Sequence, residues 1–310
     1  MQDDNVNVNI GPPPVPWSGS EIVLCAILAG VFWPQAMYAL LKGVGVEHWY
    51  YGDNAPEMQN RLGLWAAALA LPFQVLTYPF VFAAMSGTRP EQLGLTLRHL
   101  GRNVLAGLSG LLLMPDVFAL FWLVRQCYGV NGEDGIERHA LEKLGDQNLY
   151  VGEWIMLVFT ATVGAPLHEE LAFRGALQPW LAKGRWRGLL AMFGALALAC
   201  WYRHSQTIDA FPKGLAPLLE AAVPILFVLA LLPLYLLVAF FGGSQATALV
   251  GASTLFACIH SAWPTPIPLF LLALGLGVLA QRTRSLVAPI VLHSLFNSVA
   301  CIQLLMEKIM

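Results

Sequence analysis

The chain has 310 residues, of which 57% are hydrophobic and only 12% are charged, and its formal net charge is −2 at pH 7. A soluble domain carries about a quarter charged residues, so this composition excludes an ordinary soluble protein and indicates a membrane protein. The charge balance also lacks the basic excess of nucleic-acid-binding proteins. We therefore expect a multi-pass integral membrane protein, located in the plasma membrane, with no nucleic-acid partner.

The five cysteines are scattered and form no C-x-x-C pair. A disulfide framework or a cysteine zinc site is therefore not expected. Residues 1–20 contain no Lys or Arg and include Pro12-Pro13-Pro14. This stretch lacks the basic start of a secretory signal, so we predict a disordered leader followed by a retained span.

Apolar runs of about 20 residues, the length that crosses a bilayer, follow one another along the chain. The clear candidates are Ile22–Leu41, Leu62–Met85, Val104–Val124, Trp154–Leu167, Leu215–Phe241 and Leu286–Met306. The shorter candidates are Gly188–Trp201, Thr247–Trp263 and Ile267–Ala280. The pattern predicts an all-α, polytopic bundle of about nine helices, or eight if one short run is re-entrant.

Several spans contain proline, which predicts kinks that neighbouring helices can tolerate in a membrane. Asp116 follows Pro115 in the middle of one span. We interpret Asp116 as a structural acid that faces the bundle at a kink, with a second buried polar site as the alternative.

The longest polar segment, 125–148, is predicted to be an acidic loop outside the membrane, with a short surface helix at 135–144. Three short clusters of basic residues occur elsewhere, around Arg98, Arg185 and Arg284. Nine spans place all three clusters on the side of the amino terminus, opposite the acidic loop. Short loops rich in Lys and Arg face the cytoplasm.

Two adjacent carboxylates, Glu169 and Glu170, follow directly on an apolar run. Carboxylates at hydrocarbon depth are costly and usually functional. Glu170 and Arg174 are four apart, so on a helix they share a face and can pair. Glu169 is then the free carboxylate and the candidate general acid or base. Spacing alone leaves the exchange of these two roles open.

Three more polar residues lie in apolar surroundings, namely His260, His293 and Asn297. His293 and Asn297 are four apart and can point to one place. Together with a carboxylate, these groups could activate a water and polarise a carbonyl. Glu169, His260 and His293 are also competent zinc ligands, so a Zn²⁺ site and a metal-free glutamate mechanism both stay open.

Other hydrolase patterns are absent from the sequence. His168-Glu169 begins an HExxH motif, but Ala172 occupies the closing position, and there is no GxSxG elbow. Each polar group taken alone has a structural explanation, as a helix clamp or an interhelical hydrogen bond. Their joint occurrence in three apolar runs favours a functional site.

These segments resemble the CAAX protease and bacteriocin-processing (CPBP, or Abi) family of intramembrane proteases, which includes the type II CAAX prenyl endopeptidases. The EExxFR motif matches Glu169 to Arg174, the FxxxH motif matches Phe256 and His260, and the HxxxN motif matches His293 and Asn297. The resemblance implies a helical bundle with an intramembrane active-site cavity. It also implies that the first-motif Glu activates water and that His260, His293 and Asn297 complete the site of a protease often labelled a metalloprotease.

The chain departs from this family between the first two motifs. About 80 residues separate Arg174 from Phe256, where the family has the second motif on the next helix. We predict a two-helix insert near 188–241, and we prefer His260 to His204 as the second-motif histidine. His204 follows Trp201 and Tyr202, an aromatic pair typical of a membrane interface.

We therefore predict an intramembrane endopeptidase that hydrolyses a membrane-associated or lipid-modified peptide. The alternative is a non-catalytic membrane binding protein or transporter-like receptor, although no inverted repeat is visible in the sequence. The predicted segments are a leader (1–20), amino-terminal spans with the polar loop (21–150), and a protease core containing the insert (151–306).

Overall fold

The structure is a computed structural model that describes residues 15–46, 58–127, 149–207, 215–260 and 266–309. Within these ranges every regular element is a helix, which confirms the all-α prediction. The surface helix predicted at 135–144 lies outside the described residues.

Short 3₁₀- or π-helical segments, labelled η, join many of the α-helices. The first half of the chain contains α1 (Gly19–Ile27), η1 (Leu28–Phe32), α2 (Trp33–Gly43), α3 (Met58–Ser86), η3 (Pro90–Leu93), α4 (Leu100–Ser109), η4 (Gly110–Leu113) and α5 (Met114–Cys127). The second half contains α7 (Val151–Phe159), η5 (Thr160–Gly164), α8 (Ala165–Glu170), η6 (Leu171–Leu177), α9 (Gln178–Leu181), α10 (Gly188–Thr207), α11 (Leu215–Phe241), α12 (Gly243–Ile259), α13 (Pro266–Thr283) and α14 (Val287–Ile309).

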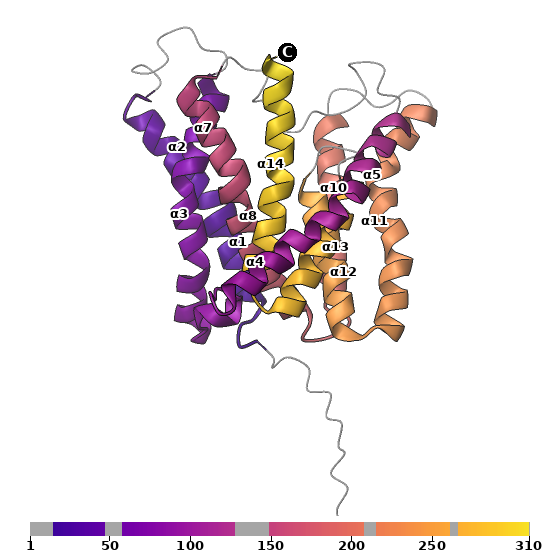
Figure 1. Ribbon diagram of the computed structural model, residues 1–310. Helices are drawn as coiled ribbons and strands as arrows, with labels where there is room; N and C mark the ends of the chain where they lie inside the picture. The colour runs from indigo at the N-terminus through magenta and orange to yellow at the C-terminus, as the bar shows by residue number, and fades with distance from the viewer. Residues whose placement is uncertain (1–14, 47–57, 128–148, 208–214, 261–265, 310) are drawn as a thin grey trace, which may run out of the picture.

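Six helical segments are long and apolar enough to cross a membrane, and three shorter apolar helices lie in α10, α11 and α12. Over the described residues this gives the nine apolar segments that the sequence predicted. The segments run back and forth between the two ends of the bundle (Figure 1). The protein is therefore an integral, multi-pass membrane protein, while its placement in the plasma membrane stays a prediction.

The two helices that carry the predicted histidines pack tightly in the bundle. A methyl group on Gly107 of α4 would lie 2.6 Å from the carbonyl oxygen of Ala288 in α14. A methyl group on Gly251 of α12 would lie 2.9 Å from the carbonyl oxygen of Gly188 in α10. Such small residues let membrane helices approach closely. They fix α12 and α14 against their neighbours.

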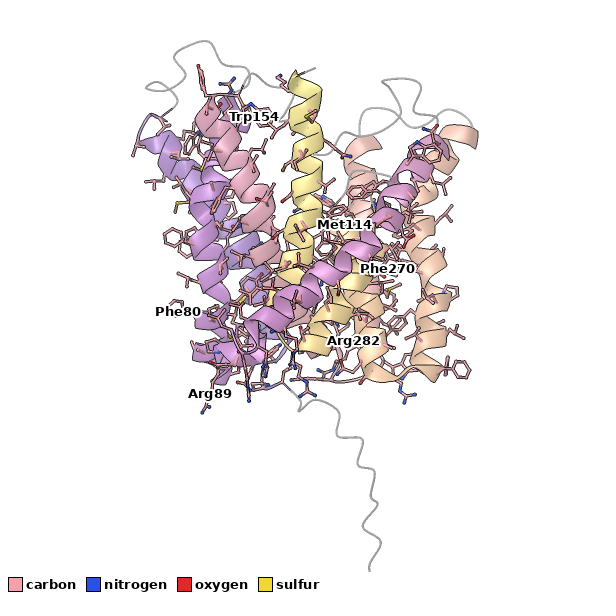
Figure 2. All side chains as sticks on the ribbon, in the orientation of Figure 1. Phe80, Arg89, Met114, Trp154, Phe270 and Arg282 are labelled. Atoms are coloured by element: carbon pink, nitrogen blue, oxygen red, sulfur yellow. The ribbon has the colours of Figure 1, made fainter. Side chains whose placement is uncertain are left out.

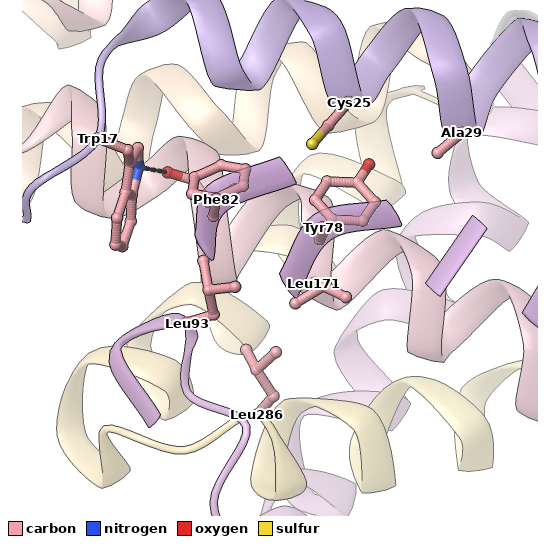
Figure 3. Close-up of a cluster of buried hydrophobic side chains, with 9 residues drawn as sticks. Trp17, Cys25, Ala29, Tyr78, Phe82, Leu93, Leu171 and Leu286 are labelled. Atoms are coloured by element: carbon pink, nitrogen blue, oxygen red, sulfur yellow. Dashed lines mark hydrogen bonds between the residues drawn. The ribbon is translucent and has the colours of Figure 1, made fainter. Parts of the chain in front are cut away.

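Some residues of the predicted leader, 1–20, belong to the fold. Trp17 is completely buried, and its indole nitrogen donates to the carbonyl of Ala176 at 3.1 Å. Trp17 also meets Phe82 edge to face (Figure 3). Ser18 caps α1, which starts at Gly19. Residues 15–20 therefore belong to the fold, because an apolar anchor and a capping box follow the prolines.

Asp116 does not face the bundle as predicted. It is exposed on α5, whereas Val117 and Met114 on the same helix are buried against α13 and α14. This placement argues against both readings of Asp116, as an inward structural acid and as a second buried polar site. The inward face of α5 is apolar, and the carboxylate lies outside it.

Candidate active site

The first motif lies deep in a long helical segment. The elements α7, η5, α8, η6 and α9 run without a break from Val151 to Leu181. Glu169 is 18 residues from the start and 12 from the end of this segment. At 1.5 Å per residue, these separations correspond to about 27 and about 18 Å, which places the carboxylate at hydrocarbon depth.

Glu170 and Arg174 form the buried pair that their spacing predicts. Arg174 Nη1 lies 3.1 Å from Glu170 Oε1, and both side chains are almost fully buried. Arg174 Nη2 also donates to the carbonyl of Ala273 on α13 at 3.2 Å. Its guanidinium carbon lies 4.4 Å from the ring centroid of Phe256 on α12. Arg174 therefore ties the motif helix to α12 and α13.

The same Glu170 oxygen orients His293. Nδ1 of His293 lies 2.8 Å from Glu170 Oε1. A carboxylate paired with arginine is an acceptor only, so we assign the proton of the neutral imidazole to Nδ1. Nε2 of His293 then carries a lone pair. Glu170 is thus committed to positioning a histidine.

His260 is oriented by its own helix. It caps the carboxyl end of α12, and its Nδ1 lies 2.8 Å from the carbonyl oxygen of Phe256. A carbonyl can only accept, so Nδ1 of neutral His260 donates and Nε2 carries the lone pair. The Phe256 ring packs beside both histidines, with centroid distances of 4.8 Å to His260 and 5.8 Å to His293.

Both free imidazole nitrogens face Glu169. Nε2 of His260 lies 3.7 Å and Nε2 of His293 lies 3.8 Å from Glu169 Oε2. These distances are too long for direct hydrogen bonds, and Glu169 Oε2 has no hydrogen-bond partner among the described residues. The predicted convergence of Glu169, His260 and His293 is therefore present. Three acceptors in this arrangement match a group that supplies protons or positive charge, such as a water or a cation.

The side chains of the site differ in how far they are exposed. The side chains of Glu169 and His260 are each 19% exposed, whereas the side chain of His293 is 4% exposed. The oxygen of Glu169 that faces the histidines, Oε2, is itself buried, although other atoms of this side chain are exposed. A cavity large enough for a peptide stays a prediction.

Asn297 lies one turn beyond His293 but makes a contact that spacing did not predict. Its amide nitrogen donates to the carbonyl of Ala161 in η5 at 2.8 Å. That carbonyl is free because the N–H of Ala165 bonds to Thr160 instead, and Pro166 has no N–H to offer. Asn297 is therefore anchored to the backbone of the motif helix.

The amino-terminal span contains the same arrangement. In η1 the N–H of Trp33 bonds to Leu28, Pro34 follows, and the carbonyl of Ala29 accepts from the amide of Gln74 at 2.8 Å. In both places a proline lies five residues after the freed carbonyl. π-Helical segments are frequent at functional sites. The position of Pro166 is the sequence signal from which this contact could have been predicted.

Two other histidines stand apart from this group. His168 points toward α3, where its Nε2 lies 3.4 Å from the hydroxyl of Tyr78. His204 lies in α10, and its side chain is outside the described residues. The segment predicted as an insert, 188–241, forms α10 and α11, which pack on α12, and its being an insert stays a prediction.

The atoms that face one another at the site are of the types that bind zinc. Each imidazole donates from Nδ1 to an acceptor, as histidine ligands of metals usually do, and a carboxylate oxygen completes the set. Neighbouring ligand atoms around tetrahedral zinc are about 3.4 Å apart, so the observed 3.7 and 3.8 Å would have to shorten. No group of three or more His, Cys, Asp or Glu side chains within the described ranges has the spacing to hold a metal ion.

Comparison with protein families gives one match. The family described as type II CAAX prenyl endopeptidase Rce1-like matches residues 151–241 and 225–299. The matched region, residues 151–299, is just under half of the chain and is similar to the Rce1-like family. The matched segments contain all six predicted site residues, and they overlap within α11 of the insert. Comparisons with curated proteins and with solved structures find no match.

The match to the Rce1-like family confirms the resemblance to CAAX proteases and supports a protease in general. The metalloprotease type and the bacteriocin-processing branch stay predictions. The catalytic roles of the individual residues also stay predictions, although the structure brings Glu169, Glu170, Arg174, His260 and His293 together.

Proposed function

We propose that the protein is an intramembrane endopeptidase that cleaves a prenylated, CAAX-type peptide. One observation carries the proposal: Glu169 Oε2 faces the Nε2 atoms of two histidines whose protons are held elsewhere. A hydrolytic water can donate one hydrogen bond to Glu169 Oε2 and the other to one of these imidazoles. The Rce1-like family supplies the substrate class.

In the proposed reaction, the water donates one hydrogen bond to an imidazole Nε2 and loses its other proton to Glu169 as its oxygen attacks the peptide carbonyl carbon. A carbon–oxygen bond forms, and the carbonyl oxygen becomes negative. Asn297 uses one amide N–H on Ala161, and its second N–H can donate to that oxygen. The carbon–nitrogen bond then breaks, and Glu169 returns the proton to the leaving amine.

The surrounding residues hold this geometry rigid. Glu170 fixes His293, and Arg174 fixes Glu170 while it also holds α12 and α13. Preorganisation of this kind lowers the cost of reaching the transition state. If a divalent cation binds, Glu169, His260 and His293 would hold it, and it would make the bound water more acidic.

A cleavage assay tests the proposal. Purified protein in lipid nanodiscs would be given a farnesylated CAAX peptide and the same peptide without the lipid, with products identified by mass spectrometry. We expect cleavage of the lipidated peptide, preserved activity in Asp116→Asn and loss of activity in His260→Ala. Tight binding with unaltered peptide would instead favour the alternative, a non-catalytic membrane binding protein.

A separate measurement tests whether the activity depends on a bound metal ion. Active protein would be treated with a chelator, and its metal content and turnover would then be measured on the same sample. Full activity without bound metal would establish the glutamate mechanism. Activity that falls in proportion to zinc content and returns on adding zinc would establish a metal site.

A further inference from the structure

One end of the bundle is strongly basic. The loops that join α3 to α4, α9 to α10 and α13 to α14 lie at this end, where Arg89 and Arg282 are labelled in Figure 2. Eight Lys and Arg occur in or beside these loops: Arg89, Arg98, Arg102, Lys183, Arg185, Arg187, Arg282 and Arg284. The acids described at this end are Glu21 and Glu91, which leaves six net positive charges on a chain whose total is −2.

Some of these bases already have partners in the protein. Lys183 donates to the carbonyl of Trp17, Arg185 donates to the carbonyl of Ala239, and Arg187 lies over the Trp180 ring. The remaining five are exposed and form no ion pair within the described part of the chain, namely Arg89, Arg98, Arg102, Arg282 and Arg284. Their guanidinium groups are free to bind an external anion.

Four of the five unpaired arginines flank one junction between two loops. The N–H of Leu286 donates to the carbonyl of Gly94 at 3.0 Å, and the hydroxyl of Ser285 donates to the carbonyl of Thr96 at 3.3 Å. These bonds bring the segment with Arg98 and Arg102 against the segment with Arg282 and Arg284. We call this cluster of four arginines the arginine junction.

The arginine junction lacks the counter-charge that its position calls for. Arg98 and Arg102 lie on either side of the first residue of α4, where the helix dipole is already positive. The first turn of α4 contains no acid, and its N-cap residue, His99, makes no side-chain capping bond. An anion at this point would relieve repulsion that the described residues leave uncompensated.

The neighbouring apolar side chains favour an anion that is part of a lipid. Leu97 is 75% exposed and Leu100 is 46% exposed, and they alternate with the arginines along the chain. All four arginines lie within about one turn of a helix end, which is headgroup depth for a spanning helix. Leucines can enter the acyl region while guanidinium groups bind phosphate from above.

We propose that the arginine junction binds the phosphate of an anionic phospholipid in the cytoplasmic leaflet. The surface potential of that leaflet is negative, and short basic loops face the cytoplasm. The site would hold the start of α14, the helix that carries His293. The proposal does not depend on peptidase activity, because its readout is lipid retention.

The backbone conformation allows one arginine of the junction to be replaced by glycine without added strain. Arg284 has φ of 51° and His99 has φ of 57°, both in the left-handed region that favours glycine. Arg284→Gly therefore removes a charge without adding backbone strain. His99→Gly relieves the backbone in the same way without removing an arginine. Lys42→Ala removes an exposed charge at the opposite end of the bundle.

The experiment measures lipids retained by delipidated, full-length protein after incubation with mixed phosphatidylcholine and phosphatidylglycerol, using native mass spectrometry. We expect selective retention of phosphatidylglycerol. Retention should fall about fivefold for each arginine removed, and by about two orders of magnitude in the Arg98→Ala, Arg102→Ala, Arg284→Gly triple variant. His99→Gly and Lys42→Ala should bind like the wild type.

Three results would overturn the lipid site. Equal retention of the two lipids would show that the protein does not select the anionic lipid. Equal losses of phosphatidylglycerol retention in Lys42→Ala and the triple variant would show that the arginine junction is not the binding site. Complete competition by inorganic phosphate at a matched concentration would identify a free-phosphate site instead. A melting temperature for the triple variant in neutral detergent close to that of the wild type would show that it folds.

Discussion

Asn297 donates from its side-chain amide to the carbonyl oxygen of Ala161, 2.8 Å away on the helix that carries Glu169. The bond joins the third motif to the first through backbone rather than through another motif residue. It exists because a π-helical segment and Pro166 together leave this carbonyl without a backbone donor.

The first prediction follows from this contact. Pro166→Ala restores an N–H that can compete with Asn297 for the Ala161 carbonyl, so the amide should lose its fixed orientation. We expect kcat to fall by about tenfold to a hundredfold with little change in KM, because small misplacements of a reacting group are costly. Steady-state kinetics on a lipidated peptide provide the measurement.

Pro34→Ala is the matched control for that prediction. It makes the same change beside Ala29 and Gln74, where the arrangement recurs away from the site. Both variants should show similar changes in melting temperature, but only Pro166→Ala should lose turnover. Equal losses of kcat in the two variants would show that the proline acts through helix stability and not through Asn297.

A second prediction concerns the buried pair. Arg174→Met leaves the Glu170 carboxylate buried without its cation, and breaking such a pair costs about 3–5 kcal/mol. The free energy of unfolding in detergent should fall by that amount, whereas Arg282→Met, at an exposed arginine, should change it by less than about 1 kcal/mol. Similar small changes in both variants would mean that Arg174 does not stabilise the packing of α12 and α13 on the motif helix.

The third prediction separates the two candidate second-motif histidines. His260→Ala removes an imidazole that lies 3.7 Å from Glu169 and should abolish most peptide cleavage. His204 lies on α10, so His204→Ala should keep most of the peptide-cleavage activity. If a cleavage assay gave the opposite order, the second motif would belong to the insert and the assignment of α12 would be wrong.

Much of this architecture could be predicted from the sequence because apolar length determines membrane helices almost alone. The pairing of Glu170 with Arg174 was also predictable, since residues four apart on a helix must lie close together. The convergence of His260 and His293 on Glu169 rested on the resemblance to a family, because no local rule brings together helices from distant parts of the chain.

Other features depended on tertiary contacts that the sequence does not display. Trp17 looked like part of a leader, and only the carbonyl of Ala176 and the ring of Phe82 explain its burial. The commitment of Glu170 to His293 required the Nδ1 contact. The prediction that Asp116 faces the bundle was wrong. Its neighbours are apolar on both faces of the helix, so the sequence pattern did not indicate which face is buried.

The central claim is that Glu169 is the base that activates water, and Glu169→Gln tests it most directly. The substitution keeps the shape of the side chain but removes its basicity, so kcat should fall by about 10²- to 10⁴-fold while the melting temperature stays that of the wild type. Glu170→Gln, measured beside it, should lower the melting temperature because Glu170 holds Arg174 and His293. A folded Glu169→Gln protein that still cleaves lipidated peptide at the wild-type rate would contradict this account.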